Sequence, residues 1–185
     1  MRKSLLALFF ILSAVPLLAA TLAGVTLPDT VTVGDKTLVL NGMGLRKKLF
    51  ISVYVGGLYL DKKSADPNAI IQADQPKRTV LHFVYSEVSR DQMADAFKEG
   101  FDGNTPDKVK TLKPQIDQWI AALEAMKKGE EMAVTYVPGT GTTLTLRGKD
   151  KLTIPGLPFA QAVFAVWLGP KPPSNDLKTG MLGRK

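Results

Sequence analysis

The sequence has no cysteine and a single histidine among its 185 residues. The lack of cysteine excludes disulfide bonds, thiolate metal sites and cysteine nucleophiles, so the folded domain must rely on its hydrophobic core. His82 alone cannot form a metal site, and the sequence has no Asp or Glu cluster at metal-ligand spacing. We interpret His82 as a structural histidine on a strand, with an axial haem ligand or an acid-base group as alternatives.

Common catalytic and nucleotide-binding motifs are also missing. Residues 139–141, Gly-Thr-Gly, follow a proline and lack the lysine of a phosphate-binding loop, which makes them a hairpin turn. Residues 42–44, Gly-Met-Gly, lack the third glycine and the following helix of a dinucleotide-binding fingerprint. No order of Ser, His and Asp stands out as a catalytic triad.

The net charge is +7, and the basic residues are spread along the chain rather than gathered in one run. Solvated faces are therefore the simplest interpretation of these residues. A patch that attracts an anionic ligand, or anionic lipid at a membrane surface, is the alternative. We expect no nucleic-acid partner, because the chain has no recognisable module and no basic helix with interleaved aromatic residues.

The first 20 residues have the pattern of a bacterial signal peptide. Residues 1–3 are basic at Arg2 and Lys3, residues 5–18 are apolar, and small residues allow cleavage after about residue 20 or 23. The apolar run is shorter than the roughly 20 residues that span a bilayer, so an uncleaved anchor is the less favoured alternative. We predict export to the periplasm or the outside of the cell, with residues 24–185 as a single domain.

The stretch from residue 41 to residue 60 organises the rest of the chain. We interpret residues 41–44 as a glycine-rich turn that leads through Arg46 into an apolar strand over residues 49–60. A strand this apolar should be buried on both faces and lie inside a sheet, with Arg46 at its entrance. Gly56 and Gly57 predict a bulge, or a close approach by a ligand or another backbone.

Hydrophobic periodicity predicts the remaining elements. Strands are expected at residues 25–27, 30–33, 37–40, 79–85, 132–137 and 142–146, with 151–154 continuing the last one past a turn or bulge at residues 148–150. Helices are expected at residues 66–71, 86–100, 105–128 and 159–168, the last one buried against the sheet, and the polar tail from residue 171 should be partly loose. Strands with segregated helices indicate an α+β fold, an antiparallel sheet covered by helices on one face.

Several residues should define the helix ends. Asp66 and Thr105 are expected N-caps, and Ser89 with Gln92 fits a capping box. Pro114 should kink the third helix or divide it in two, and Gly129 should cap its C-terminus.

Arg46 is the sharpest candidate for a binding residue. A guanidinium at the start of an apolar strand needs an anion or several acceptors, because a buried unpaired charge is costly. It could clamp a carboxylate, a phenolate or a propionate; a structural salt bridge or a solvated turn residue is the alternative. Tyr54 and Tyr59 should point to opposite faces, with Tyr54 on the face of Arg46.

The Gly-x-Gly-x-Arg turn at residues 42–46, with the strand end Gly-Leu-Tyr-Leu at residues 57–60, resembles the chalcone isomerase-like superfamily. The hairpin at residues 139–141 and the apolar helix that ends at residues 167–169 are similar to its layout. The resemblance runs from about residue 27 to about residue 183, and it is strongest to the bacterial exported branch. It implies an open-faced β-sandwich, in which a layer of helices packs over a large antiparallel sheet, with a cleft beside Arg46.

The resemblance also says which chemistry to expect. Plant chalcone isomerases close a chalcone to a flavanone, and Arg46 matches the arginine that assists this step electrostatically. Their other polar positions correspond here to Tyr54, Val88, Asp95 and Val166, so most of the polar set is missing. Other members of the family are non-enzymatic: some resemble fatty-acid-binding proteins whose arginine holds the carboxylate, and fungal mitochondrial relatives bind haem.

We therefore expect a non-enzymatic exported protein that binds a small apolar anionic ligand, a fatty acid or a haem-like molecule. Arg46 would pair with the anionic group, Tyr54 would hydrogen-bond beside it, and Phe97, Phe101 and the last helix would supply apolar wall. No cofactor is required, and haem is the weaker option. Two alternatives stay open: a chalcone-flavanone isomerase with Arg46 as electrophilic residue, and a periplasmic structural or partner-binding protein whose cleft is filled by side chains.

Overall fold

The computed structural model describes residues 19–184, so residues 1–18 of the predicted signal peptide lie outside the described residues. The strands are β1 (Ala19–Leu22), β2 (Val25–Pro28), β3 (Thr30–Val33), β4 (Lys36–Lys48), β5 (Ile51–Leu60), β6 (Lys77–Phe83), β7 (Glu87–Val88), β8 (Met126–Lys127), β9 (Glu131–Val137), β10 (Gly141–Leu146) and β11 (Lys149–Ile154). The helices are α1 (Pro67–Gln72), α2 (Arg90–Asn104), α3 (Pro106–Val109), α4 (Lys113–Ala121), α5 (Leu157–Leu168) and α6 (Asn175–Met181). Within residues 19–184, no helix combines the length and the apolar character needed to cross a membrane.

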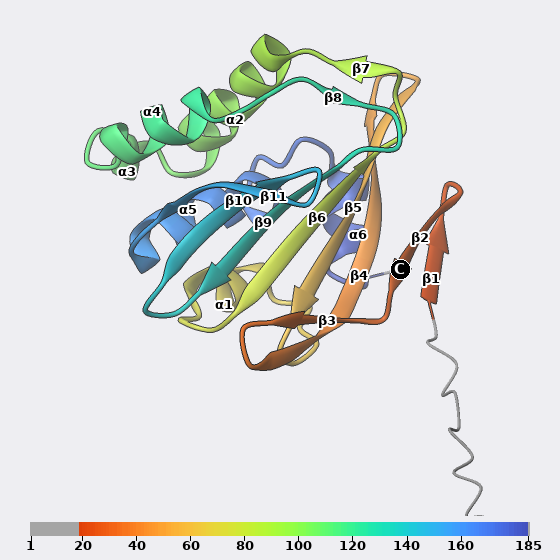
Figure 1. Ribbon diagram of the computed structural model, residues 1–185, viewed down its shortest axis with the longest axis horizontal. Helices are drawn as coiled ribbons and strands as arrows, with labels where there is room; N and C mark the ends of the chain where they lie inside the picture. Colours follow the sequence, from red (N-terminus) through yellow and green to blue (C-terminus); the bar gives the residue numbers. More distant parts are fainter. Residues whose placement is uncertain (1–18, 185) are drawn as a thin grey trace, which may run out of the picture.

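One large antiparallel sheet forms the body of the protein (Figure 1). Its seven strands follow the order β11-β10-β9-β6-β5-β4-β3, while β1 with β2 and β7 with β8 form separate two-stranded ribbons. The strand β5 therefore has a partner on each side, as its apolar sequence predicts. The mixed α+β architecture is confirmed.

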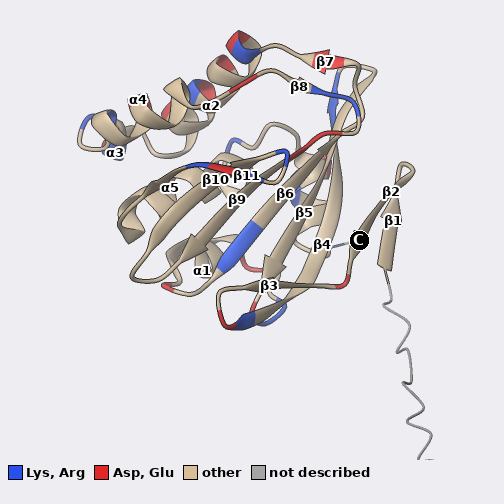
Figure 2. Ribbon diagram, viewed as in Figure 1, with Lys and Arg blue, Asp and Glu red and all other residues tan. Residues whose placement is uncertain are grey.

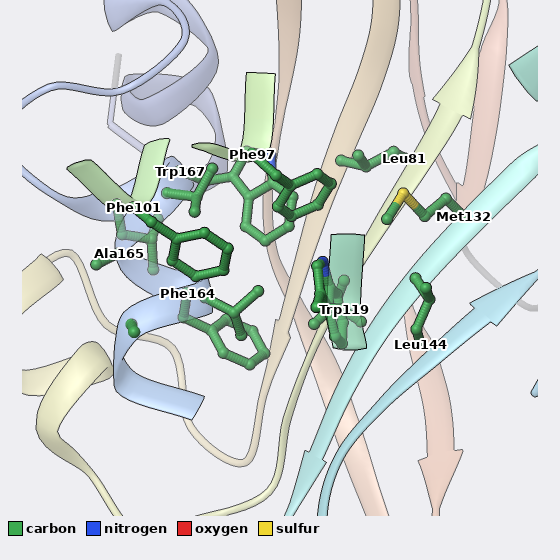
Figure 3. Packing of buried hydrophobic residues seen from close by; sticks show 14 of the residues in the cluster. Leu81, Phe97, Phe101, Trp119, Met132, Leu144, Phe164, Ala165 and Trp167 are labelled. Carbon is green, nitrogen blue, oxygen red and sulfur yellow. The ribbon is translucent and has the colours of Figure 1, made fainter. Parts of the chain in front are cut away.

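The two faces of the sheet are covered differently. All the longer helices contribute to one large hydrophobic core, in which Phe97 and Trp119 pack against sheet residues such as Leu81 and Met132 (Figure 3). The opposite face carries a smaller core, in which Leu27 of the β1–β2 ribbon packs with sheet residues that include Tyr59. We call these two sides the helix face and the ribbon face.

The glycine-rich turn expected at residues 41–44 is not a turn. The strand β4 runs through it, and the hairpin turn falls at Leu49 and Phe50 instead. A register shift between Leu40 and Gly42 marks a bulge in β4. Leu40 contributes to the ribbon-face core, whereas the partner of Gly42 contributes to the helix-face core. The bulge therefore turns Gly42, Gly44 and Arg46 to the helix face and leaves Met43 and Leu45 on the ribbon face.

The glycines of β4 allow α6 to lie directly on the strand. A Cβ added to Gly42 would collide with the backbone oxygen of Gly180, and one added to Gly44 with that of Leu177. The same explanation holds in part for β5, where Gly56 and Gly57 are contacted by leucine side chains from the two faces, with no register shift between them. Close approach is therefore the reason for these glycines, but the approaching groups belong to the protein.

The C-terminal tail is ordered, contrary to our expectation from its polar sequence. It forms α6, whose Leu177 and Met181 are buried. The side chain of the buried Asn41, at the β4 bulge, donates a hydrogen bond to Met181 O over 2.8 Å, and Lys178 Nζ donates to Gly169 O over 2.7 Å. These contacts fix α6 against β4 although its own sequence has little apolar character.

Most predicted caps agree with the structure, but two helices have other bounds than predicted: α2 covers Arg90–Asn104 instead of residues 86–100, and residues 126–127, expected in a helix, form β8. The Asp66 carboxylate caps α1, Ser89 and Gln92 form the capping box of α2, and Pro114 stands at the start of α4, so two short helices follow α2. Two predictions are wrong. Thr105 makes no side-chain cap for α3 because its hydroxyl donates to Phe101 O, and Gly129 lies in the turn after β8, since α4 already ends at Ala121.

The segment after β10 also differs from the prediction. The turn lies at Arg147 and Gly148, both with positive φ, and not at residues 148–150, and the chain then forms the separate edge strand β11 instead of continuing β10. The apolar segment that precedes the tail forms α5 as expected, and its residues from Phe159 onward are nearly all buried against the sheet and α2.

Candidate functional site

Arg46 and Tyr54 lie opposite each other on neighbouring strands. They are direct register partners in the β4–β5 hairpin, and the guanidinium carbon of Arg46 is 5.4 Å from the centroid of the Tyr54 ring. This is the geometry of a cation–π contact. The two residues thus share the helix face as predicted, but as partners on neighbouring strands, because a register shift and the hairpin turn separate them along the chain. Tyr59 points to the ribbon face and donates its hydroxyl to Pro28 O over 2.9 Å.

The Tyr54 hydroxyl donates no hydrogen bond to another described residue. Trp167 Nε1 on α5 donates a hydrogen bond to Tyr54 Oη over 3.2 Å, so the tyrosine oxygen acts as acceptor in this contact. Burial raises the pKa of Tyr54, although the charge of Arg46 and the hydrogen bond from Trp167 oppose this effect. The hydroxyl therefore stays protonated at neutral pH and can donate to a further acceptor.

Arg46 has unused hydrogen-bonding capacity. Its Nε is buried and has no hydrogen-bond partner among the described residues. Across residues 19–184, no carboxylate forms an ion pair with Arg46, so the structural salt bridge is not observed in this range. A buried donor without a partner is destabilising by about 1–3 kcal/mol, and a ligand oxygen would remove that penalty.

Two spaces meet at Arg46. The first, the inner cavity, has a volume of about 20 Å³ and is lined by Arg46, Tyr54, Leu81, Met93, Ala96, Phe97, Val166, Trp167 and Pro173. The second, the outer groove, has a volume of about 290 Å³ and is lined by Arg46, Lys48, Ile51, Val53, Tyr85, Val88, Gln92, Asp95, Ala96 and Glu99. Arg46 and Ala96 border both spaces.

The structure brings three of the four predicted site residues together. Phe97 on α2 lines the inner cavity with Arg46 and Tyr54, and its ring is in edge contact with that of Trp167, with centroids 5.7 Å apart. Phe101, one turn further along α2, lies deeper in the aromatic core against Phe159 and borders a different surface groove (Figure 3). The last helix, α5, supplies Val166 and Trp167 to the wall of the inner cavity.

The positions that correspond to the polar set of plant chalcone isomerases also gather around Arg46. Val88 and Asp95 line the outer groove, and Val166 lines the inner cavity. These three positions therefore border the same two spaces as Arg46, and two of them carry apolar side chains. The polar set implied by the resemblance is therefore incomplete around Arg46.

Sequence analysis missed several residues of the site. Gln92, Ala96 and Glu99 recur every three or four residues of α2, so their helical spacing could have placed them on one exposed face. Trp167 and Tyr85 had no comparable signal, because an aromatic residue in an apolar helix or at a strand end is usually core. Lys48 could not be placed while the hairpin turn was assigned to residues 41–44.

His82 lies away from this site. Its Nδ1 is 3.0 Å from Glu131 Oε1, and the two residues are register partners on β6 and β9. Its partner on β5 is Val55, a residue of the ribbon-face core, so His82 is on the face opposite Tyr54. In the described part of the chain, no group of three or more His, Cys, Asp or Glu side chains could hold a metal ion.

Comparison with known proteins agrees with this architecture. A family model described as chalcone isomerase-like matches residues 19–183. The chain belongs to this family. The comparison with curated proteins finds no match. Among solved structures, a fatty-acid binding protein from Arabidopsis thaliana has a similar fold, with a TM-score of 0.68 and 17% identity over 89% of this chain and 95% of that chain. At this identity the similarity supports the chalcone isomerase-like fold and nothing finer.

Proposed function

We propose that this chalcone isomerase-like protein binds a small ligand with an anionic head group and an apolar chain, a fatty acid in the simplest case. The observation that carries the proposal is the unpartnered, buried Nε of Arg46 at the junction of the inner cavity and the outer groove. The fatty-acid binding protein with the same fold supports the ligand class.

Arg46 and Tyr54 supply complementary chemistry for a carboxylate. The guanidinium offers a positive charge and several N–H donors. The Tyr54 hydroxyl offers one more donor, because its oxygen accepts the hydrogen bond from Trp167 Nε1 and its proton remains available to a ligand. Both donors lie on adjacent strands of a hydrogen-bonded sheet, so their separation is fixed before the ligand arrives. Such preorganisation lowers the entropic cost of binding.

The sizes of the two spaces constrain the ligand. The inner cavity, of about 20 Å³, has room for a group about the size of one water molecule. The outer groove, of about 290 Å³, is at the lower limit of small-molecule sites, and its apolar wall includes Ile51, Val53 and Val88. We assign the head group to the Arg46–Tyr54 pair and one slim apolar chain to the outer groove.

Haem fits this site poorly. A tetrapyrrole is larger than the outer groove, whose volume is about 290 Å³, and His82, the only histidine, faces the other side of the sheet. The isomerase alternative retains Arg46, but Val88 and Val166 stand where, according to the family resemblance, plant chalcone isomerases carry polar groups.

The charged side chains around the outer groove leave direct contact with Arg46 as the main source of preference for an anionic ligand. Lys48 adds a second positive charge, while Asp95 and Glu99 place two negative charges on the same groove. The four charges nearly cancel at long range. Preference for an anion therefore depends on direct contact with the guanidinium rather than on steering by the surface potential.

The proposal can be tested by isothermal titration calorimetry of the purified protein with dodecanoate and with dodecanol, which has the same chain without the charge. Arg46→Gln should weaken dodecanoate binding about tenfold or more and leave dodecanol almost unaffected. Arg78→Gln is the matched control: Arg78 Nε is also buried without a partner, but its register partner Tyr59 is on the ribbon face. Equal losses in the two variants, or no binding to the parent protein, would overturn the proposal.

We also propose that the protein is exported, on the strength of the basic and apolar pattern of residues 1–20. Intact-mass measurement of the chain after expression with its own N-terminus tests this. Loss of about the first 20 to 23 residues is expected, and this cleavage would remove part or all of β1 (Ala19–Leu22). Full-length chain in the membrane fraction would instead support the uncleaved anchor, and full-length chain in the cytoplasm would contradict export.

A further inference from the structure

The large hydrophobic side chains exposed on the described surface all lie at one end of the sheet. Leu49 is 87% exposed, Phe50 99%, Ile51 47% and Tyr85 39%. Within residues 19–184, the other large hydrophobic residues are buried or partly buried. Scattered single residues of this kind are normal on a protein surface, but four at one place indicate an interaction site.

These four residues form one structural unit, which we call the apolar tip. Leu49 and Phe50 make the turn of the β4–β5 hairpin, and Ile51 opens β5. Val53 O accepts a hydrogen bond from Tyr85 N over 3.1 Å, which holds Tyr85 against the same hairpin. In Figure 1 the hairpin extends past the body of the sheet, close to β7 and β8.

The fold does not require apolar residues at this turn. Leu49 has a φ of 55°, in the left-handed region where glycine is favoured and a leucine is strained. Phe50 is almost completely exposed to water. A glycine followed by a small polar residue would suit this two-residue hairpin turn better on both counts. Leucine and phenylalanine therefore serve something outside the folded chain.

Lysines surround the apolar tip. Lys47 and Lys48 precede it in β4, and both are exposed. Lys127 and Lys128 reach the same end through the β7–β8 ribbon, where Lys128 N donates to Ser86 O over 3.1 Å, next to Tyr85. Figure 2 shows these basic segments around the end of the hairpin.

Acidic residues at this end do not cancel the charge of the four lysines. Glu87 is the register partner of Lys127 and is exposed. Glu130 is engaged with the chain itself, because its carboxylate accepts from Lys127 N and contacts Arg147. Asp95 and Glu99 lie on the outer groove beside the apolar tip, and Asp95 is paired there with Lys98. Across residues 19–184 none of the four lysines forms an ion pair, so their charges remain available at the edge of the apolar tip.

We propose that the apolar tip and its lysines dock the protein on an anionic lipid surface, with Leu49 and Phe50 inserted at the depth of the head groups. Apolar and aromatic side chains favour this interfacial region, and each lysine close to an anionic membrane adds to the attraction. A protein partner fits less well, because stable protein interfaces bury roughly 800 Å² per partner and a projecting turn offers far less.

Docking in this way would also orient the ligand site. Ile51 and Tyr85 belong to the apolar tip and also line the outer groove, together with Lys48. The groove would then open toward the lipid surface, from which an acyl chain could enter. This consequence rests on the proposed function, whereas the docking itself does not.

Cosedimentation of the protein with vesicles tests the docking. Vesicles of phosphatidylcholine with one third phosphatidylglycerol should bind the protein, and binding should fall as salt rises. The double variant Leu49→Gly with Phe50→Ser should lower the partition coefficient about tenfold or more while keeping the hairpin, since it relieves the positive φ. Comparing variants of the same chain removes any contribution of the apolar N-terminus, which they share.

The lysines can be tested with a matched pair. Changing Lys127 and Lys128 to Glu should reduce binding to the anionic vesicles about tenfold or more. Changing Lys62 and Lys63 to Glu makes the same change in net charge at exposed positions beyond the other end of β5, and it should reduce binding much less. Equal losses from the two pairs would show that net charge alone attracts the protein, and would overturn a specific docking face.

Insertion itself has a direct signal. Trp119 and Trp167 are buried, so a tryptophan introduced by Phe50→Trp would be the only exposed one among the described residues. Its emission should shift to shorter wavelength on anionic vesicles and be quenched by brominated lipid, while Lys36→Trp at the other end of β4 should do neither.

An unshifted emission, or binding equal to the parent in the Leu49→Gly and Phe50→Ser variant, would overturn the proposal. Dodecanoate binding of that variant should be unchanged, because neither residue lines the outer groove or the inner cavity, so the two proposals can fail separately.

Discussion

Arg46 lies directly across the β4–β5 hairpin from Tyr54, with its guanidinium carbon 5.4 Å from the centroid of the tyrosine ring. The aromatic ring and the hairpin backbone hold the arginine in place, while its Nε remains without a hydrogen-bond partner among the described residues. A positioned but unsatisfied cation at the junction of two spaces is suited to bind an anionic group. Without such a ligand it lowers stability.

The Tyr54 hydroxyl should contribute to ligand binding and to folding in separable ways. Tyr54→Phe removes the proton available to a ligand carboxylate and leaves Trp167 Nε1 without its acceptor. We expect dodecanoate affinity to fall several-fold and the free energy of unfolding to fall by about 1–2 kcal/mol. Titration calorimetry and urea unfolding measure the two effects. Unchanged affinity with reduced stability would remove Tyr54 from the site.

The acidic rim of the outer groove should weaken anion binding in the native protein. Asp95 and Glu99 line the groove that Arg46 borders, and both are exposed on α2. The double variant Asp95→Asn with Glu99→Gln, which replaces both carboxylates by neutral amides, should raise dodecanoate affinity a few-fold at low salt and less at high salt. Asp102→Asn on the same helix borders a different groove and is the control. A gain of the same size in the control would point to net charge alone.

The glycines of β4 should be sensitive to the smallest addition. Gly44→Ala would place its Cβ against the backbone of Leu177, which cannot move without displacing α6 from the sheet. We expect a loss of about 2 kcal/mol or more in the free energy of unfolding, measured with urea. Gly103→Ala in α2 would make only ordinary contacts with the Lys171 side chain and should be neutral or slightly stabilising. Similar results for the two variants would contradict the close packing of α6.

Lys77 should give the stability a recognisable pH dependence. Its side chain is buried, and Nζ donates to Ile70 O and Ala73 O, both over 2.7 Å. Burial lowers the pKa of Lys77 from 10.5 to about 8. Between these two values the unfolded chain binds this proton and the folded protein does not. The contribution of Lys77 to the free energy of unfolding therefore rises with pH across this window.

Urea unfolding of the parent and of Lys77→Met at about pH 7 and about pH 9.5 measures this contribution. The parent should gain stability relative to the variant over that interval. The interval stops below the ordinary tyrosine pKa of 10, because burial raises the pKa of Tyr59 to about 12 and thereby contributes the opposite trend at higher pH. Parallel changes in the two proteins would mean that Lys77 keeps its proton, held by the carbonyl oxygens around it.

Local patterns in the sequence were enough for most of the elements. The capping box at Ser89 and Gln92, the cap at Asp66 and the break at Pro114 depend on residues within one helical turn, so the sequence contains all the information they need. The alternation that separates Tyr54 from Tyr59 is equally local, because side chains on a strand point to alternate faces. The family resemblance added the layout of the sheet and drew attention to Val88, Asp95 and Val166, which border the same spaces as Arg46.

The glycines of β4 show where local prediction ends. The same residues at positions 42 and 44 are compatible with a turn and with close packing in a strand, and only the position of α6 decides between them. The helix α6 in turn has a polar sequence and owes its order to Asn41 and the groove left by those glycines, more than a hundred residues away. A short stretch of sequence around the glycines or around α6 does not show that the two segments pack together.

The sequence by itself determined the fold class, the faces of most strands, the caps of two helices and the choice of Arg46 as the residue to examine. The tertiary structure decided that Arg46 faces Tyr54 from a neighbouring strand, that Phe97 borders the site while Phe101 does not, and that Leu49 and Phe50 project into solvent. The physical reason is the distance along the chain over which each kind of interaction acts. Capping and alternation act between neighbours in the chain, whereas a binding site and an exposed tip are defined by which distant segments pack together and which surface they leave uncovered.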